Sequence, residues 1–161
     1  MASHNILPAF VVLCLLTCLA PAQAPLPAST QSRLASQTRL ENMTQYDFAK
    51  VVWQAQSGEP EAQYLVAEAY LEGRLVARDN AVAASWMRKS AEQNYLPAQA
   101  GMGLLLVSGV TEEGPIPDRD EAEKWLKLAA RQGDADAQLW LATGYQRGWF
   151  GADDDRRRYV G

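Results

Sequence analysis

The side chains most often used for nucleophilic catalysis and zinc binding are confined to the first eighteen residues of this 161-residue chain. His4 is its only histidine, and Cys14 and Cys18 are its only cysteines. Ser-His-Asp catalysis, Cys-His catalysis and Cys/His zinc sites all require these residue types. The rest of the chain therefore lacks the groups that each of these chemistries needs.

Two charged runs remain as candidates for chemistry. The run Asp118, Asp120, Glu121 and Glu123 could supply paired carboxylates or Ca²⁺ ligands, but it lacks the glycine and the alternating oxygen ligands of a calcium loop. Acids are also favoured in the first turn of a helix. Residues 153–158 read Asp-Asp-Asp-Arg-Arg-Arg, so that on a helix each Asp meets an Arg at i+3. We therefore predict a self-paired tail rather than a phosphate- or membrane-binding patch, and no catalytic, metal or cofactor site in either run.

The composition bounds the class of protein. Fifteen Lys and Arg against nineteen Asp and Glu give a net charge of −4, which argues against a nucleic-acid partner. The 48% hydrophobic and 21% charged content is that of an ordinary globular chain, and the length fits one domain.

The N-terminal segment has the pattern of an export signal. An apolar run from Ile6 to Ala20 is followed by Ala22-Gln23-Ala24, a small-x-small cleavage pattern, and the run is shorter than the roughly 20 residues of a membrane span. We predict a signal peptide over 1–24, cleavage after Ala24, and a periplasmic or secreted product without Cys or His. An uncleaved membrane anchor and a lipoprotein attached at Cys18 remain the alternatives.

The next two segments lead into the main body of the chain. Residues 25–43 are rich in Pro, Ser, Thr, Ala and Gln and show little apolar periodicity, which predicts a flexible tether. Asn42-Met43-Thr44 matches a glycosylation triplet, although a helix cap at Asn42 or Thr44 is favoured. Residues 44–57 are predicted to form a degenerate leading helix with a stripe of Phe48, Val51, Val52 and Ala55.

An internal repeat occupies most of the chain beyond residue 57. Ala62-Gln63 recurs as Ala98-Gln99 and Ala137-Gln138, and each pair is followed by a glycine at the same distance, namely Gly73, Gly109 and Gly148. A second block recurs at an offset of 39 residues: Asp79, Ala83, Trp86 and Ala91 correspond to Asp118, Ala122, Trp125 and Ala130. Such periodic self-similarity is typical of a stacked repeat architecture.

Within each block the apolar residues recur at i, i+3, i+4, i+7 and i+8, the spacing of a buried helical stripe. The glycines are placed to end the first helices, and Asp79 and Asp118 are placed to begin the second ones. We predict an all-α chain with repeat one at 58–95, repeat two at 96–134, a half repeat at 135–152 and a charged tail at 153–161. Small residues at Ala67, Gly103 and Ala142 would mark close helix crossings.

The order Ala-Gln, small residue, Tyr, Gly, Asp, Ala, Trp and Gln-Gly resembles the Sel-one-like repeat, a relative of the tetratricopeptide repeat. The second unit follows that pattern closely, and the first departs from it at Leu75 and Asn94, where the family usually has glycine. The resemblance implies a right-handed α/α solenoid of helix–loop–helix units.

The resemblance also implies that a partner binds the concave face formed by the first helix of each unit. The side chains expected there are Tyr64, Glu68, Glu72, Leu104, Ser108, Leu139, Thr143 and Arg147. The leading hypothesis is an exported, non-catalytic scaffold or adaptor that binds a peptide or protein. The alternatives are a β-lactamase-like hydrolase, as in cysteine-rich relatives, and a structural subunit of an envelope machine. The mature chain lacks the paired cysteines of those relatives and any Ser-x-x-Lys element.

The third unit has no second helix to cover its apolar residues, which include Trp140, Leu141 and Tyr145. One expectation is an exposed end at which Trp149 and Phe150 dock a partner or a second copy of the chain. The other is that the tail folds back as a cap, or that the repeat array is simply degraded at its end.

Overall fold

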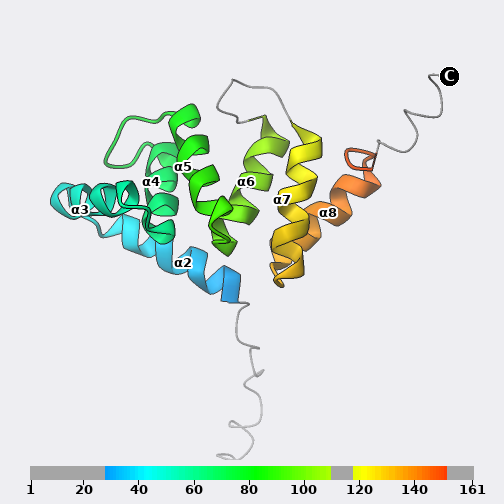
Figure 1. The fold of residues 1–161 in the computed structure, drawn as a ribbon, viewed down its shortest axis with the longest axis horizontal. Helices are drawn as coiled ribbons and strands as arrows, with labels where there is room; N and C mark the ends of the chain where they lie inside the picture. The colour runs from blue at the N-terminus through cyan, green and yellow to red at the C-terminus, as the bar shows by residue number, and fades with distance from the viewer. Residues whose placement is uncertain (1–27, 110–117, 152–161) are drawn as a thin grey trace, which may run out of the picture.

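The computed structural model describes residues 28–109 and 118–151. Within these ranges the chain forms seven helices and no strand (Figure 1), so the predicted all-α fold is confirmed. The helices are α2 (Ala28–Glu41), α3 (Gln45–Gln56), α4 (Pro60–Glu72), α5 (Asn80–Glu92), α6 (Leu96–Ser108), α7 (Arg119–Arg131) and α8 (Ala135–Gln146). The predicted signal peptide at 1–24 and the charged tail at 153–161 lie outside the described residues.

The helices from α3 to α8 follow one another side by side as a solenoid, each packed on the next (Figure 1). The pairs α4–α5 and α6–α7 are the two predicted helix–loop–helix units, and α8 is the first helix of a third. We call the surface to which α4, α6 and α8 contribute the first-helix face.

The residues expected to cap the helices do so. Gly73 and Gly109 end α4 and α6 with left-handed backbone, at φ 69° and 81°, which glycine adopts without steric cost. The side chains of Asp79, Asp118 and Asp134 accept hydrogen bonds from backbone amides at the starts of α5, α7 and α8.

The two positions at which the first unit departs from the repeat pattern have the backbone that the pattern requires. Leu75 and Asn94 both lie in the left-handed region, at φ 66° and 63°. Asparagine tolerates this conformation, whereas leucine adopts it only at a steric cost. The chain therefore keeps the loop geometry of the repeat at both positions without the glycines.

The leading helix is present as α3, with Phe48, Val51 and Ala55 buried. Thr44 and Asp47 form a capping box at its start, which supports the helix-cap interpretation of the Asn42–Thr44 triplet.

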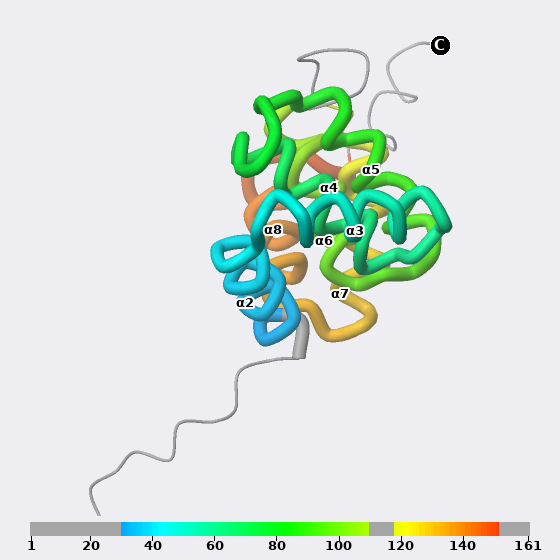
Figure 2. The backbone as a smooth tube through the Cα atoms, turned by 90° about the vertical axis from the view of Figure 1, so that its left-hand side faces the viewer, coloured from blue at the N-terminus to red at the C-terminus, as the bar shows by residue number. Residues whose placement is uncertain are grey.

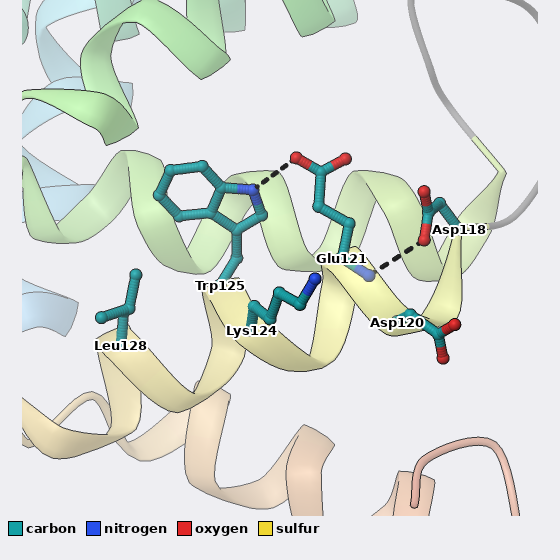
Figure 3. Close-up of a pocket in the computed structure, with 6 residues that line it drawn as sticks. All are labelled: Asp118, Asp120, Glu121, Lys124, Trp125 and Leu128. Atoms are coloured by element: carbon teal, nitrogen blue, oxygen red, sulfur yellow. Dashed lines mark hydrogen bonds between the residues drawn. The ribbon is translucent and has the colours of Figure 1, made fainter. Parts of the chain in front are cut away.

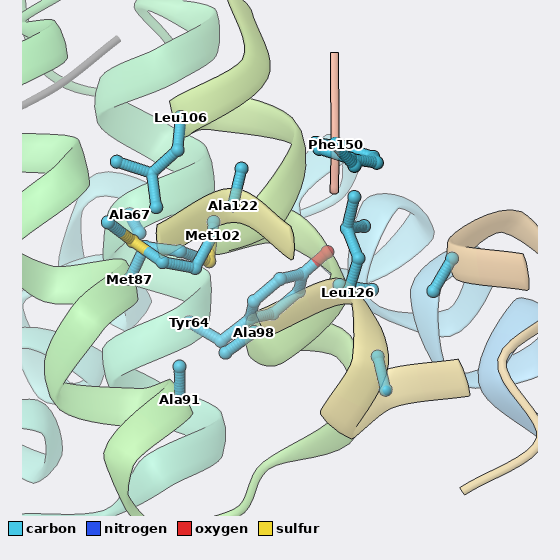
Figure 4. Packing of buried hydrophobic residues seen from close by; sticks show 13 residues of the cluster. Tyr64, Ala67, Met87, Ala91, Ala98, Met102, Leu106, Ala122, Leu126 and Phe150 are labelled. Atoms are coloured by element: carbon cyan, nitrogen blue, oxygen red, sulfur yellow. The ribbon is translucent and has the colours of Figure 1, made fainter. Parts of the chain in front are cut away.

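The core is built from the predicted stripes. One cluster joins α4 to α7 and includes Met87, Met102, Leu106 and Leu126 (Figure 4), and Trp86 and Trp125 pack against it. Ala67 is buried as expected at a crossing. At Gly103 an added Cβ would lie 2.6 Å from Leu126 Cγ, so glycine allows α6 and α7 to approach. Ala142 is exposed, because α8 has no following helix among the described residues to cross it, and that expectation is wrong.

The predicted tether is also wrong over most of its length. Residues Ala28–Glu41 form α2, which packs against α4 and α6. Its contact face consists of Arg33, Ser36 and Leu40, at i, i+3 and i+7, and Ser36 and Leu40 are buried. Only one of the three is apolar, so hydrophobic periodicity does not indicate this helix.

Candidate partner-binding face

Helix α2 lies across the ends at which α4, α6 and α8 begin (Figures 1 and 2). Near its C-terminus, Arg39 Nη1 donates to Glu61 Oε1 in the first turn of α4, at 2.7 Å. One turn earlier, the Ser36 hydroxyl donates to the Ser32 carbonyl at 3.0 Å and lies beside the hydroxyl of Tyr95, the N-cap residue of α6. Successive turns of α2 thus contact successive repeat units of the solenoid.

A further contact of α2 is an arginine between two carboxylates. Arg33 donates one Nη to Asp134 and the other to Asp136, both at the start of α8. The Asp134 side chain is fully buried, and its second oxygen accepts the amide of Ala137 at 2.7 Å. Burial acts to lower the pKa of Arg33, but the hydrogen bond to Asp134 and the two carboxylate charges outweigh it and raise that pKa.

Two residues of α4 complete the surroundings of Arg33. The Tyr64 hydroxyl and the Glu68 carboxyl lie close together, one turn apart on α4. Burial raises the pKa of Glu68 to about 7, and the nearby charge of Glu72 adds to this rise, while the Tyr64 hydroxyl and the charge of Arg33 oppose it. Burial also raises the pKa of the Tyr64 hydroxyl. We call Tyr64, Glu68, Asp134 and Asp136 the Arg33 seat.

Tyr64 and Glu68 lie one turn apart on α4, and the structure does not leave Tyr64 open. Tyr64 is only 3% exposed, because the Tyr95 ring lies 5.6 Å from its own and Arg33 of α2 lies close by. The prediction that Tyr64 is an open binding residue is therefore wrong. Leu139, which holds the equivalent position in the third unit, is 65% exposed.

The other predicted residues of the face vary in exposure. Glu72, Ser108 and Arg147 are exposed, and Leu104 and Thr143 are half-buried. The hydroxyls of Ser108 and Thr143 each donate to a carbonyl one turn earlier on their own helix, at 2.9 Å, as such hydroxyls often do in helices. Their polar groups are already engaged within the helix.

Sequence reasoning missed the residues that α2 brings to the face. Arg33, Ser36 and Arg39 lay in the segment predicted as a tether, and Asp134, the N-cap of α8, was not among the candidate binding residues. The helical spacing of Arg33, Ser36 and Leu40 was a sequence signal for this helix. The signal was weak, because a helix that is held by long-range ion pairs shows no apolar periodicity in its own sequence.

The end of the third unit is covered by the chain itself. Phe150 is 5% exposed and lies edge-on to Tyr145, with ring centroids 5.8 Å apart. Its ring occupies the space beside Gly144, where a Cβ would overlap it. Phe150 is thus part of the core and not a docking residue, so that expectation is wrong. Residues Trp149 to Gly151 fold back against α8 and α7, whereas the charged tail at 153–161 lies outside the described residues.

A single carboxylate secures this fold-back. Glu123 of α7 accepts hydrogen bonds from the Tyr145 hydroxyl at 2.5 Å and from the Gly151 amide at 3.3 Å. It also pairs with Lys127 Nζ at 2.6 Å. Trp149 remains half-buried, with the guanidinium of Arg147 4.9 Å from its ring centroid.

The acidic run on α7 serves the fold. Asp118 caps the helix, and Glu121 accepts a hydrogen bond from Arg88. Glu121 also accepts a hydrogen bond from Trp125 Nε1 (Figure 3). An open depression at this place is lined by Asp118, Asp120, Glu121, Lys124, Trp125 and Leu128. Among the described residues, no group of three or more His, Cys, Asp or Glu side chains is arranged to hold a metal ion.

Tandem helix–loop–helix units with equivalent core tryptophans and glycine-ended first helices define an α/α repeat protein. The family model of the Sel1 repeat matches residues 60–95 and 96–134, which coincide with the two complete units. The chain thus contains two Sel1 repeats.

Solved structures agree with that assignment. A Sel1 repeat protein from Oxalobacter formigenes is 36% identical, with a TM-score of 0.57, over 62% of this chain and 28% of that one. A protective antigen of uropathogenic Escherichia coli that displays an SLR fold is 32% identical, with a TM-score of 0.58, over 66% of this chain and 22% of its own.

An uncharacterized protein of Neisseria meningitidis serogroup B is also similar, at 32% identity over 94 residues. That match covers 58% of this chain and 18% of the relative. The chain thus spans less than a third of the length of each of these relatives. Within the part of the chain that the structure describes, no helix has the length and apolar character to cross a membrane.

Proposed function

We propose that this protein is an exported, non-catalytic adaptor that binds a peptide or protein partner in the cell envelope or outside the cell. The observation that carries the proposal is the tandem pair of Sel1 repeats, a family whose members generally serve as protein-interaction scaffolds. Repeat solenoids present extended surfaces built from equivalent helix positions, and such surfaces bind other chains.

The composition of the first-helix face supports this role. Beyond the turns that α2 covers, it carries an exposed aliphatic side chain, Leu139, together with charged Glu72 and Arg147. A mixture of apolar and polar side chains is usual in interaction surfaces that must also stay soluble. The proposal of export is supported by the apolar run and the Ala22-Gln23-Ala24 pattern.

The absence of catalysis is supported by chemistry. Beyond residue 24 the sequence holds no His and no Cys. Glu68 has a pKa raised to about 7, which would suit a general base, but its carboxyl lies beside the Tyr64 hydroxyl and close to the charge of Arg33.

The experiment is crosslinking and capture of the tagged full chain from its native envelope, with two matched variants. Leu139→Asp places a charge on the first-helix face, and Leu128→Asp places the same charge on α7, where Leu128 is 40% exposed. We expect a specific partner that is lost with Leu139→Asp and kept with Leu128→Asp. Equal capture by both variants would contradict binding at this face.

Export is tested separately by cell fractionation and by the mass of the purified product. We expect the protein outside the cytoplasm with an N-terminus at Pro25. A full-length product in the cytoplasmic fraction would overturn that part of the proposal.

A further inference from the structure

The contacts of α2 are those of a docked ligand more than those of a core helix. Three of its side chains reach three different units through polar groups, and Leu40 is its buried aliphatic anchor. Its other leucine, Leu34, is 47% exposed. Helix α2 is thus held on the first-helix face mainly by its arginines.

The surface beneath α2 is acidic and needs a cation. Glu61, Glu68, Asp134 and Asp136 come from two helices far apart in the sequence, and all of them lie next to an arginine of α2. A fully buried carboxylate such as Asp134 is unfavourable without a compensating charge. Two carboxylates that bind separate Nη atoms suit a planar guanidinium better than an ammonium group.

Helix α2 fills this site incompletely. Arg33 Nε is buried, and it has no hydrogen-bond partner among the described residues. Leaving such a donor unpaired opposes docking.

Helix α2 is joined to α3 by a short link. Helix α2 ends at Glu41, and α3 begins behind its own capping box of Thr44 and Asp47, so residues 42–44 can act as a hinge. Departure of α2 also takes Leu40 out of the core cluster that it shares with α3.

Resting on the proposed function, we propose that the Arg33 seat recognises an arginine-bearing amphipathic helix of a partner protein, which replaces α2 on the first-helix face. The partner helix would carry the pattern of α2: an arginine, a small polar residue at i+3, a second arginine at i+6 and a leucine at i+7, as in Arg33, Ser36, Arg39 and Leu40. The chain's own helix occupies the seat until such a partner arrives.

The test uses a fluorescent peptide with the sequence of residues 28–43 as the probe and the full chain as the receptor. In the wild-type chain the tethered α2 competes with the peptide at high effective concentration. In the Arg33→Glu chain α2 is repelled by Asp134 and Asp136, and the peptide binds at least about tenfold more tightly. Arg131→Glu, the same charge change in the last turn of α7, binds the peptide as the wild type does.

Two further arms address the chemistry of the seat. A peptide with Arg33→Lys binds the Arg33→Glu chain at least about fivefold more weakly than the native peptide, because an ammonium group cannot reproduce the two-carboxylate contact. Adding Asp136→Asn to the Arg33→Glu chain weakens binding as well, and Asp136 is exposed enough for that change to leave the fold intact. If Arg33→Glu lowers the helical content, Arg33→Ala replaces it with the same expected direction.

The outcomes separate this inference from the proposed function. Equal peptide affinity for the wild-type and Arg33→Glu chains, or no binding to either, overturns the Arg33 seat as a recognition site. If partner capture still depends on Leu139 in that case, the adaptor function stands. If capture is also lost, both proposals fail.

Discussion

Gly103 is the position at which the packing of the two repeats is tested most directly. In α6 it faces Leu126 of α7, a fully buried side chain. A Cβ added there would lie 2.6 Å from Leu126 Cγ, 2.7 Å from Cδ2 and 3.3 Å from the Leu126 backbone nitrogen. The first two distances are far inside van der Waals contact. Because the backbone is also close, rotation of Leu126 alone cannot relieve the overlap in Gly103→Ala.

Two opposing effects set the size of the change. Alanine in a helix interior is favoured over glycine by about 1 kcal/mol. Forcing an extra carbon into a packed core costs about 1–3 kcal/mol, and this site lies at the upper end because the neighbour is buried and partly backbone. We expect Gly103→Ala to lower the free energy of unfolding by about 1–2 kcal/mol.

The same helix offers a matched control. At Gly101 an added Cβ would meet Met87 at Sδ and Cε, 3.1 and 3.2 Å away, the flexible end of an unbranched side chain. We expect Gly101→Ala to be neutral or stabilising by up to about 1 kcal/mol. Urea unfolding followed by circular dichroism measures both variants under the same conditions.

A second change identifies the cause. Leu126→Ala alone should cost about 2–5 kcal/mol through the cavity that it leaves. Combined with Gly103→Ala, the loss should be at least about 1 kcal/mol smaller than the sum, because the new methyl group enters that space. If Gly103→Ala unfolds like the wild type, or if the two changes are additive, α6 and α7 do not approach as described.

Three further predictions concern the loops, the cap and the buried acid. Asn94→Gly should leave stability within about 0.5 kcal/mol, whereas Asn94→Ala should cost about 1 kcal/mol or more because of its positive φ; equal effects would refute the left-handed backbone. Phe150→Ala should lower the free energy of unfolding in urea by about 2–4 kcal/mol, whereas Leu139→Ala, at an exposed position, should lower it by less than about 0.5 kcal/mol. A neutral Phe150→Ala would mean that the Phe150 ring is not packed at this end of the solenoid. Because the pKa of Glu68 rises from 4.5 to about 7 on folding, stability falls as pH rises through that window. Glu68→Gln should remove this loss. The difference in unfolding free energy between Glu68→Gln and the wild type should therefore be about 2 kcal/mol more favourable to the variant at pH 8 than at pH 4. Parallel pH dependence of wild type and variant would show that Glu68 titrates normally.

The parts of the fold that the sequence predicted are those stabilised by apolar burial. The stripes at i, i+3, i+4 and i+7 became the faces of α3 to α8, since each helix buries one side against the next. Caps at Asp79 and Asp118 were equally predictable, because a cap depends on a few adjacent residues. The fold-back of Phe150 was not predicted, because the sequence left open a docking end, a cap formed by the tail and a degraded end. Gly144 permits it, because its missing side chain leaves room for the ring.

The candidate site was less predictable because its contacts are polar and distant. Arg33 and Asp134 lie 101 positions apart, and no local spacing connects an arginine in a Ser- and Gln-rich segment with a helix cap in the third unit. These polar contacts also make α2 suitable for replacement by a partner helix. A helix held by burial of a wide apolar stripe leaves only when the core opens, whereas a helix held by two arginines and one leucine can be replaced by another that presents the same groups. The polar contacts and the lack of a wide apolar stripe made α2 hard to predict from periodicity. The same properties suit α2 to displacement by a partner.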